Sequence, residues 1–304
     1  IGAFEAEGQT YFATANEGDA REWGGYTDEV ELKDLVKDGK VCDDLELPER
    51  IEDKKFAGNL KLTNASGWNE EKECFDDLYS YGSRSFSIYD AEGNVVFDSG
   101  AAFENITKDM PGLNFNADNE DPDFDDRSDN KGPEPEALTI GKVGDRTYAF
   151  IGAERVGGIF VYDVTTPAEA KFVTYVNNRD FSVGYDEDDV AATTKAGDLG
   201  PEGLAFVPAA DSPAEDALLI AGNEVSGTTT VFSVKDLLAD ASDNPDSPTA
   251  SGSSDGSSNS SSGSSVAAGV GIVAGLVGLG ALIGGALGFL PKTVDEFLSL
   301  IHIS

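Results

Sequence analysis

The sequence predicts an all-β fold: part of a β-propeller, followed by a disordered stalk and one transmembrane helix. A repeated strand pattern predicts the propeller. The stretch "PEPEALTIGKVGDRTYAFIGAERVGGIFVYDV" aligns with "GPEGLAFVPAADSPAEDALLIAGNEVSGTTTVFSV", and the alignment matches Glu136 with Glu202 and Glu154 with Glu224. The short apolar runs of both repeats are separated by turn residues, as an antiparallel meander requires.

About three propeller blades are visible within residues 1–239. Four short strands at 136–176 form a unit of about 40 residues, which is the size of one blade. Residues 202–234 supply three strands of a second blade. The opening "IGAFEAEGQTYFATANEGDA" supplies two strands of another, and its outer pair, "RSFSIYDAEGNVVFDSG", follows a long insertion at 17–82. The remaining blades are expected upstream of this chain.

The charge of the chain limits its partners. Fifty-seven acidic and 21 basic residues give a formal net charge of −36. Such an excess argues against DNA, RNA or an anionic lipid surface as a partner. It is consistent with a solvated, salt-tolerant extracellular surface or with a dedicated cation-binding surface.

The chain has two cysteines, Cys42 and Cys74. In a secreted chain they are expected to form a disulfide that stabilises their loop by about 3–4 kcal/mol, and two free buried thiols are the alternative. The chain opens at Ile1 without a Met or a signal peptide, so an N-terminally truncated fragment is expected. Residues 298–304, "LSLIHIS", resemble a sequencing artefact and carry no functional argument, although they include the single histidine.

The composition changes after residue 239. Residues 240–265 are rich in Ser, Gly and Asp and predict a flexible stalk. Residues 266–290 contain no charge over 25 positions, about 37 Å of helix, which favours a single transmembrane span over a buried core helix. A short tail, 291–304, follows. The expected location is therefore the cell envelope, with an extracellular propeller anchored by a single-pass C-terminal helix.

Five segments carry a resemblance to a known family: "TANEGDARE", "LYSYGSRSFSIYDAEGNVVFDSG", "RSDNKGPEPEALTIG", "YVNNRDF" and "GDLGPEGLAFVPAADSP…LLIAGNEVSGTTTVF". In this order they resemble the choice-of-anchor I family of secreted or surface β-propellers. Some of its members are similar to mesenchyme-specific cell-surface glycoprotein, and many are labelled alkaline phosphatase. The resemblance implies an exported, seven-bladed propeller. Relatives carry an Asp-Gly-Asp-Gly-Asp loop where this chain has "NASGWNEEKECFDDLY", which argues against a calcium site at 64–79.

Strand parity predicts where the repeated glutamates lie. In a four-stranded meander, the connection entering the first strand and the connection between the second and third strands lie on the same rim. The long connections 17–82, 99–134 and 177–200 share this rim, and long loops on a rigid scaffold commonly carry binding residues. The candidate ligand-binding residues are Glu17, Asp19, Arg21, Arg127, Lys131, Glu136, Glu154, Arg155, Arg179, Glu202 and Glu224.

Carboxylates that face one small volume need protons, basic partners or a hard cation. The candidate metal ligands, for Ca²⁺, are Glu136, Glu154, Asp198, Glu202 and Glu224. Internal ion pairing that staples the loops is the alternative. The function expected first is a surface-anchored, non-enzymatic module that binds an extracellular ligand or protein. The second is a calcium-dependent phosphoester hydrolase of the alkaline phosphatase or phytase kind, without a catalytic histidine.

Overall fold

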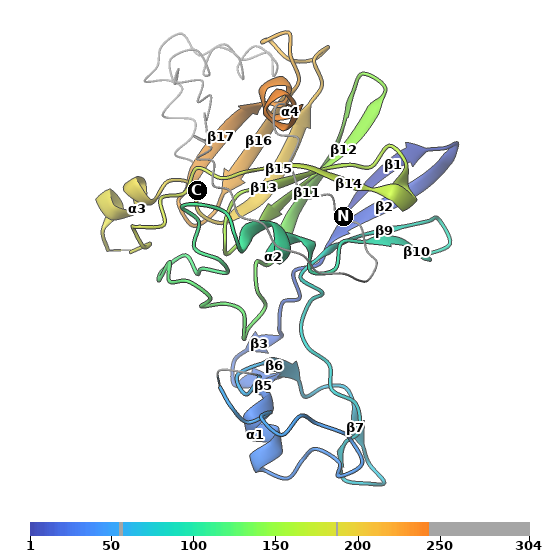
Figure 1. Ribbon diagram of the computed structural model, residues 1–304, viewed down its shortest axis with the longest axis vertical. Helices are drawn as coiled ribbons and strands as arrows, with labels where there is room; N and C mark the ends of the chain where they lie inside the picture. The colour runs from blue at the N-terminus through green and yellow to red at the C-terminus, as the bar shows by residue number, and fades with distance from the viewer. Residues whose placement is uncertain (55–56, 187, 243–304) are drawn as a thin grey trace, which may run out of the picture.

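The computed structural model describes residues 1–54, 57–186 and 188–242, and it confirms the all-β class (Figure 1). Its body consists of three antiparallel sheets that follow one another along the chain. The first has the order β1-β2-β9-β10 and the second the order β11-β12-β13-β14, and the third contains β15-β16-β17. No sheet closes on itself among these residues. The expected stalk beyond residue 242, the span 266–290 and the tail 291–304 lie outside the described residues.

The strand bounds follow the expected repeats. The first sheet contains β1 (Gly2–Ala6), β2 (Gln9–Ala15), β9 (Phe86–Tyr89) and β10 (Val95–Asp98). The second sheet contains β11 (Pro135–Val143), β12 (Arg146–Ala153), β13 (Ile159–Asp163) and β14 (Lys171–Val176). The third sheet contains β15 (Pro201–Val207), β16 (Leu218–Asn223) and β17 (Thr228–Ser233).

The second sheet is buried on both faces because its strands alternate between two cores. Ala149 and Ile151 of β12 join a core with Phe86 and Phe103 on the side of the first sheet. The intervening Phe150 belongs to a core shared with the third sheet. The three sheets are therefore packed face to face in chain order.

Glycines allow the first strands of the sheets to approach each other. A Cβ added to Gly141 of β11 would lie 2.3 Å from the ring of Phe206 in β15. A Cβ added to Gly2 of β1 would lie 2.8 Å from the side chain of Leu138 in β11. The first strands β1, β11 and β15 therefore lie beside one another in this order.

The insertion 17–82 forms a separate lobe, which projects from the three-sheet body on two chain segments (Figure 1). It contains the short strands β3 (Glu22–Trp23), β4 (Tyr26–Thr27), β5 (Glu29–Glu31), β6 (Lys61–Thr63), β7 (Trp68–Asn69) and β8 (Cys74–Phe75) and the helix α1 (Leu32–Lys37). The lobe has its own small core of Leu32, Leu35, Leu62 and Phe75. Cys42 and Cys74 form a disulfide within it, with a Cα–Cα distance of 5.1 Å.

The remaining helices lie in the connections. They are α2 (Ala102–Thr107), the 3₁₀ turn η1 (Pro167–Glu169), α3 (Val190–Ala196) and α4 (Val234–Ser242). Helix α4 extends past residue 239, where the stalk was expected to begin, because Val234 and Leu237 pack into the core of the third sheet. In the described part of the chain, no helix has the length and apolar character needed to cross a membrane.

Candidate functional site

The repeat brings its glutamates to equivalent backbone positions. The N–H of Glu154, just after β12, donates to the carbonyl of Glu134 at 2.8 Å. The N–H of Glu224, just after β16, donates to the carbonyl of Gly200, also at 2.8 Å. Strand β2 likewise leads into Glu17. The second strand of each sheet therefore delivers one glutamate to the same rim.

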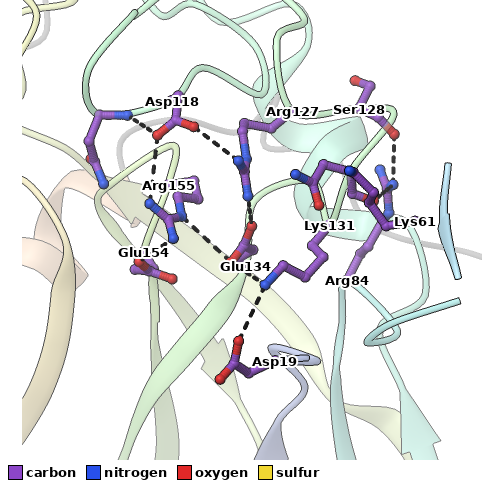
Figure 2. A network of polar contacts seen from close by, with 12 residues as sticks. Asp19, Lys61, Arg84, Asp118, Arg127, Ser128, Lys131, Glu134, Glu154 and Arg155 are labelled. Atoms are coloured by element: carbon purple, nitrogen blue, oxygen red, sulfur yellow. Dashed lines mark hydrogen bonds and ion pairs between the residues drawn. The ribbon is translucent and has the colours of Figure 1, made fainter. Parts of the chain in front are cut away.

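Glu134, which sequence reasoning missed, lies at the centre of the site (Figure 2). Its side chain is 0% exposed. The guanidinium of Arg127 donates to its Oε1, whereas Arg155 Nε lies 3.5 Å and Lys131 Nζ 3.6 Å from its Oε2. One buried carboxylate is therefore the shared partner of three cations.

A detectable signal for Glu134 is its place in the repeat. It occupies the position of Gly200, which has a φ of +68°. Glu134 adopts the same left-handed backbone, with a φ of +49°, although it carries a side chain. A non-glycine residue held in this region is strained, and such strain is concentrated at functional sites.

Asp118, in the loop before β11, is the second residue that the sequence did not indicate. Its Oδ2 lies 3.0 Å from Arg127 and its Oδ1 lies 3.7 Å from Arg155. Its carbonyl and that of Arg155 accept hydrogen bonds from the guanidinium of Arg179, which is 7% exposed. Burial lowers the pKa of Arg179 to about 10. Arg179 thus ties the connection 177–200 to the connection 99–134 and to the connection between β12 and β13.

Six glutamates face the same region, and we call them the carboxylate cluster: Glu17, Glu134, Glu136, Glu154, Glu202 and Glu224. Carboxylate oxygens of Glu17, Glu134 and Glu154 lie within 4.8 Å of one another. Glu202 and Glu224 are exposed at the edge of the cluster, and the pKa of Glu224 is raised by partial burial and by the neighbouring Glu202.

Burial and mutual repulsion raise the pKa values of four members of this cluster. Burial raises the pKa of Glu136 to about 7, and four neighbouring carboxylates add to the effect, in decreasing order those of Glu17, Glu202, Glu224 and Glu134. Burial also raises the pKa of Glu154 to about 8, although Arg155 opposes the shift from 3.1 Å. The pKa values of Glu17 and Glu224 are raised mainly by burial as well.

Several polar atoms of the site lack a hydrogen-bond partner among the described residues. They are Oε2 of Glu134, Oε2 of Glu136, and the Nε atoms of Arg127, Arg155 and Arg179. Buried polar groups are normally satisfied by protein, water or a ligand. Oε2 of Glu134 has the ion pairs with Arg155 and Lys131, whereas Oε2 of Glu136 lies among carboxylates and is an acceptor of the kind that a hard cation prefers.

Three of the expected site residues have other principal contacts. Arg21 lies in the lobe, where its Nε is 2.8 Å from Asp28. Asp198 accepts hydrogen bonds from Asn178, Thr228 and Thr230, so its carboxylate ties α3 and the preceding loop to β17. Asp19 is largely exposed, and its Oδ1 lies 3.6 Å from Lys131. The cluster is thus built from glutamates at strand ends, with Arg127, Lys131, Arg155 and Arg179 on one side of it.

Comparison with known proteins identifies the family. A family model for the choice-of-anchor I domain matches residues 1–167, more than half of the chain, and the chain belongs to this family. Gigasin-3a of Magallana gigas is 29% identical over 177 residues, which cover 56% of this chain and 60% of the relative. The match therefore spans less than two thirds of that relative's length. No solved structure gives a significant match. Membership of this family indicates an extracellular or cell-surface module.

Proposed function

We propose that the chain is part of an extracellular β-propeller that binds a ligand or partner protein at the rim formed by the carboxylate cluster, with Ca²⁺ bound there. Three consecutive antiparallel meanders, packed face to face with neighbouring first strands, support the propeller. Under this proposal each sheet is one blade, and the long connections form the binding rim. The lobe 17–82 extends from the same rim.

The observation that best supports a bound cation is the environment of Glu136. Burial raises its pKa to about 7, and repulsion by four carboxylates adds to this effect. The cations of the site gather around one part of the cluster, because Arg127, Lys131 and Arg155 converge on Glu134, and Arg155 also pairs with Glu154 at 3.1 Å. A divalent cation would relieve the repulsion that these pairs leave uncompensated. Ca²⁺ takes six to eight oxygen ligands and suits a crowded carboxylate site better than Mg²⁺ does.

The hydrolase is the weaker candidate because the basic side chains of the site already have partners within the protein. Phosphoryl chemistry needs basic groups that can clamp the phosphate oxygens as well as a metal-activated water. Arg127 and Arg155 instead contact Asp118 and Glu134, and Arg179 donates to backbone carbonyls. A p-nitrophenyl phosphate assay on the full-length protein, with Ca²⁺ and with chelator, separates the two functions. Ca²⁺-dependent turnover that Glu136→Gln abolishes would favour the hydrolase.

Thermal unfolding of the full-length protein tests the cation directly. A ligand that binds the folded state alone stabilises it by about 2.7 kcal/mol at a hundredfold excess over Kd. We expect a higher melting temperature in millimolar Ca²⁺ than in chelator at constant ionic strength, and a smaller gain in Mg²⁺. The double variant Glu202→Gln with Glu224→Gln should reduce the gain. The matched control, Glu7→Gln with Glu92→Gln, changes two exposed glutamates in the β1–β2 and β9–β10 turns and should leave it intact. A melting temperature indifferent to Ca²⁺ would make the cluster a purely salt-bridged feature.

Anchoring at the surface has its own test. A protease added to intact cells should cut within 240–265 and release the propeller. Full protection of this stretch would contradict a surface propeller with a C-terminal anchor at 266–290.

A further inference from the structure

Two Asn-X-Ser/Thr acceptor motifs for N-glycosylation occur among the described residues. They are Asn64-Ala65-Ser66 in the lobe and Asn105-Ile106-Thr107 in α2. A third motif, at 259–261, lies outside the described residues. In such motifs the asparagine amide receives the glycan, and the hydroxyl residue two positions later is needed for recognition.

The first motif is open to an enzyme. Residues 64–67 form consecutive bends between β6 and β7, and both Asn64 and Ser66 are exposed. The backbone N–H of Asn64 donates to the carbonyl of Asp28 at 2.8 Å, which fixes its place on the lobe. Its side-chain Nδ2 lies 3.5 Å from the carbonyl of Thr27, a long and weak hydrogen bond. A glycan attached there would extend into solvent without breaking a strand or helix.

The second motif is closed in the folded protein. Asn105 is exposed, but Thr107 is only 1% exposed, and its Oγ1 donates to the carbonyl of Phe103 at 2.9 Å. Helix α2 also holds the three residues in a helical conformation, and Phe103 and Ile106 anchor it in the core. Presentation of this motif would require the helix to unfold.

The compartment is compatible with the modification. The lobe that carries Asn64 is closed by the Cys42–Cys74 disulfide, and disulfides form in oxidising compartments such as the secretory pathway. The family also indicates an extracellular or cell-surface location. The inference therefore rests on the extracellular location that forms part of the proposed function.

We propose that Asn64 is an N-glycan attachment site whose donor is an oligosaccharide linked to a lipid pyrophosphate. In the transfer, Nδ2 of Asn64 forms a bond to the anomeric carbon of the first sugar, and the bond from that carbon to the pyrophosphate oxygen breaks. The lipid pyrophosphate leaves with the electron pair, and the amide proton passes to a base of the transferase. No oxidant or reductant is required.

Peptide mass spectrometry of the full-length protein isolated from its native host tests this site. Enzymatic release of N-glycans in heavy-oxygen water should convert Asn64 to a labelled aspartate. Asn64→Gln and Ser66→Ala should each remove this glycan and lower the apparent mass, whereas the matched control Asn105→Gln should change neither. An exported protein with unmodified Asn64, or with Asn105 modified to a greater extent than Asn64, would overturn the site. A chain found only inside the cell would overturn the extracellular location on which the site depends.

Discussion

Glu134 and Glu154 lie together through both their backbones and their side chains. The N–H of Glu154 donates to the carbonyl of Glu134 at 2.8 Å, and a carboxylate oxygen of each lies within 4.8 Å of the other. The backbone bond closes the connection entering β11 against the end of β12, and in doing so it forces two acidic side chains into the same volume. The fold itself therefore causes the repulsion between these carboxylates, and the surrounding cations compensate it only in part.

Replacing Glu134 by Gln should be strongly destabilising. The change keeps the volume of the side chain but leaves Arg127, Lys131 and Arg155 without their common buried counterion. Removal of one partner from a buried ion pair costs about 3–5 kcal/mol. Equilibrium denaturation should show this loss, and Glu7→Gln, which alters an exposed glutamate, should change the free energy of unfolding by less than about 0.5 kcal/mol. A loss below about 1 kcal/mol would mean that the network is dispensable.

The stability of the protein without divalent cations should fall as the pH rises. Glu136 and Glu154 have folded pKa values of about 7 and about 8, above the usual value of 4.5. Between pH 4.5 and 8 the folded state therefore binds more protons than the unfolded state, and stability decreases with pH. Their contribution is fully present below pH 4.5 and is lost as the pH passes through 7 and 8.

Thermal unfolding in chelator between pH 5 and 8.5 measures this dependence. Glu136→Gln should flatten the fall up to pH 7, because glutamine does not titrate. The same substitution at the exposed Glu92 should leave the slope unchanged. A melting temperature that rises over this interval would contradict the raised pKa values of Glu136 and Glu154.

The sequence repeat was sufficient to predict the strands of the second and third sheets, because each apolar run is bounded by turn residues. Strand parity adds the prediction that the repeated glutamates share one rim. It was insufficient for Glu134, whose role depends on a positive φ and on partners from a distant loop. Arg21 was a candidate because it lies in the family-like segment "TANEGDARE", and Asp198 was a candidate metal ligand. In the structure Arg21 pairs with the carboxylate of Asp28, and Asp198 accepts a hydrogen bond from the hydroxyl of Thr230. Strand parity does not specify such side-chain partners within a loop.

The Cys42–Cys74 disulfide should stabilise the lobe and leave the three sheets largely unaffected. The cysteines are 32 positions apart, and the chain-entropy model assigns about 3–4 kcal/mol to a loop of this size. Because both tryptophans of the chain, Trp23 and Trp68, lie in the lobe, tryptophan fluorescence reports on it selectively. In the double variant Cys42→Ser with Cys74→Ser, the tryptophan fluorescence transition of the lobe should shift to a lower denaturant concentration. The far-UV circular dichroism signal of the sheets should persist at that concentration. Simultaneous loss of both signals would show that lobe and sheets unfold as one unit.

Gly18 and Gly82 are the point at which the lobe joins the body, and they should not tolerate alanine. A Cβ on Gly18 would lie 2.0 Å from the backbone nitrogen of Gly82, and a Cβ on Gly82 would lie 2.4 Å from the carbonyl oxygen of Glu17. Both glycines also have positive φ, 84° and 58°. Gly18→Ala must therefore separate the two segments and displace the adjacent Glu17 from the carboxylate cluster. We expect a lower melting temperature and a smaller stabilisation by Ca²⁺ than in the parent protein.

Gly93→Ala is the matched control, since Gly93 has a φ of 86° in the β9–β10 turn with open space around it. It carries the same backbone strain without the clash, so it should lower the melting temperature but leave the response to Ca²⁺ unchanged. Equal responses to Ca²⁺ in the two variants would show that the lobe junction does not influence the cation site.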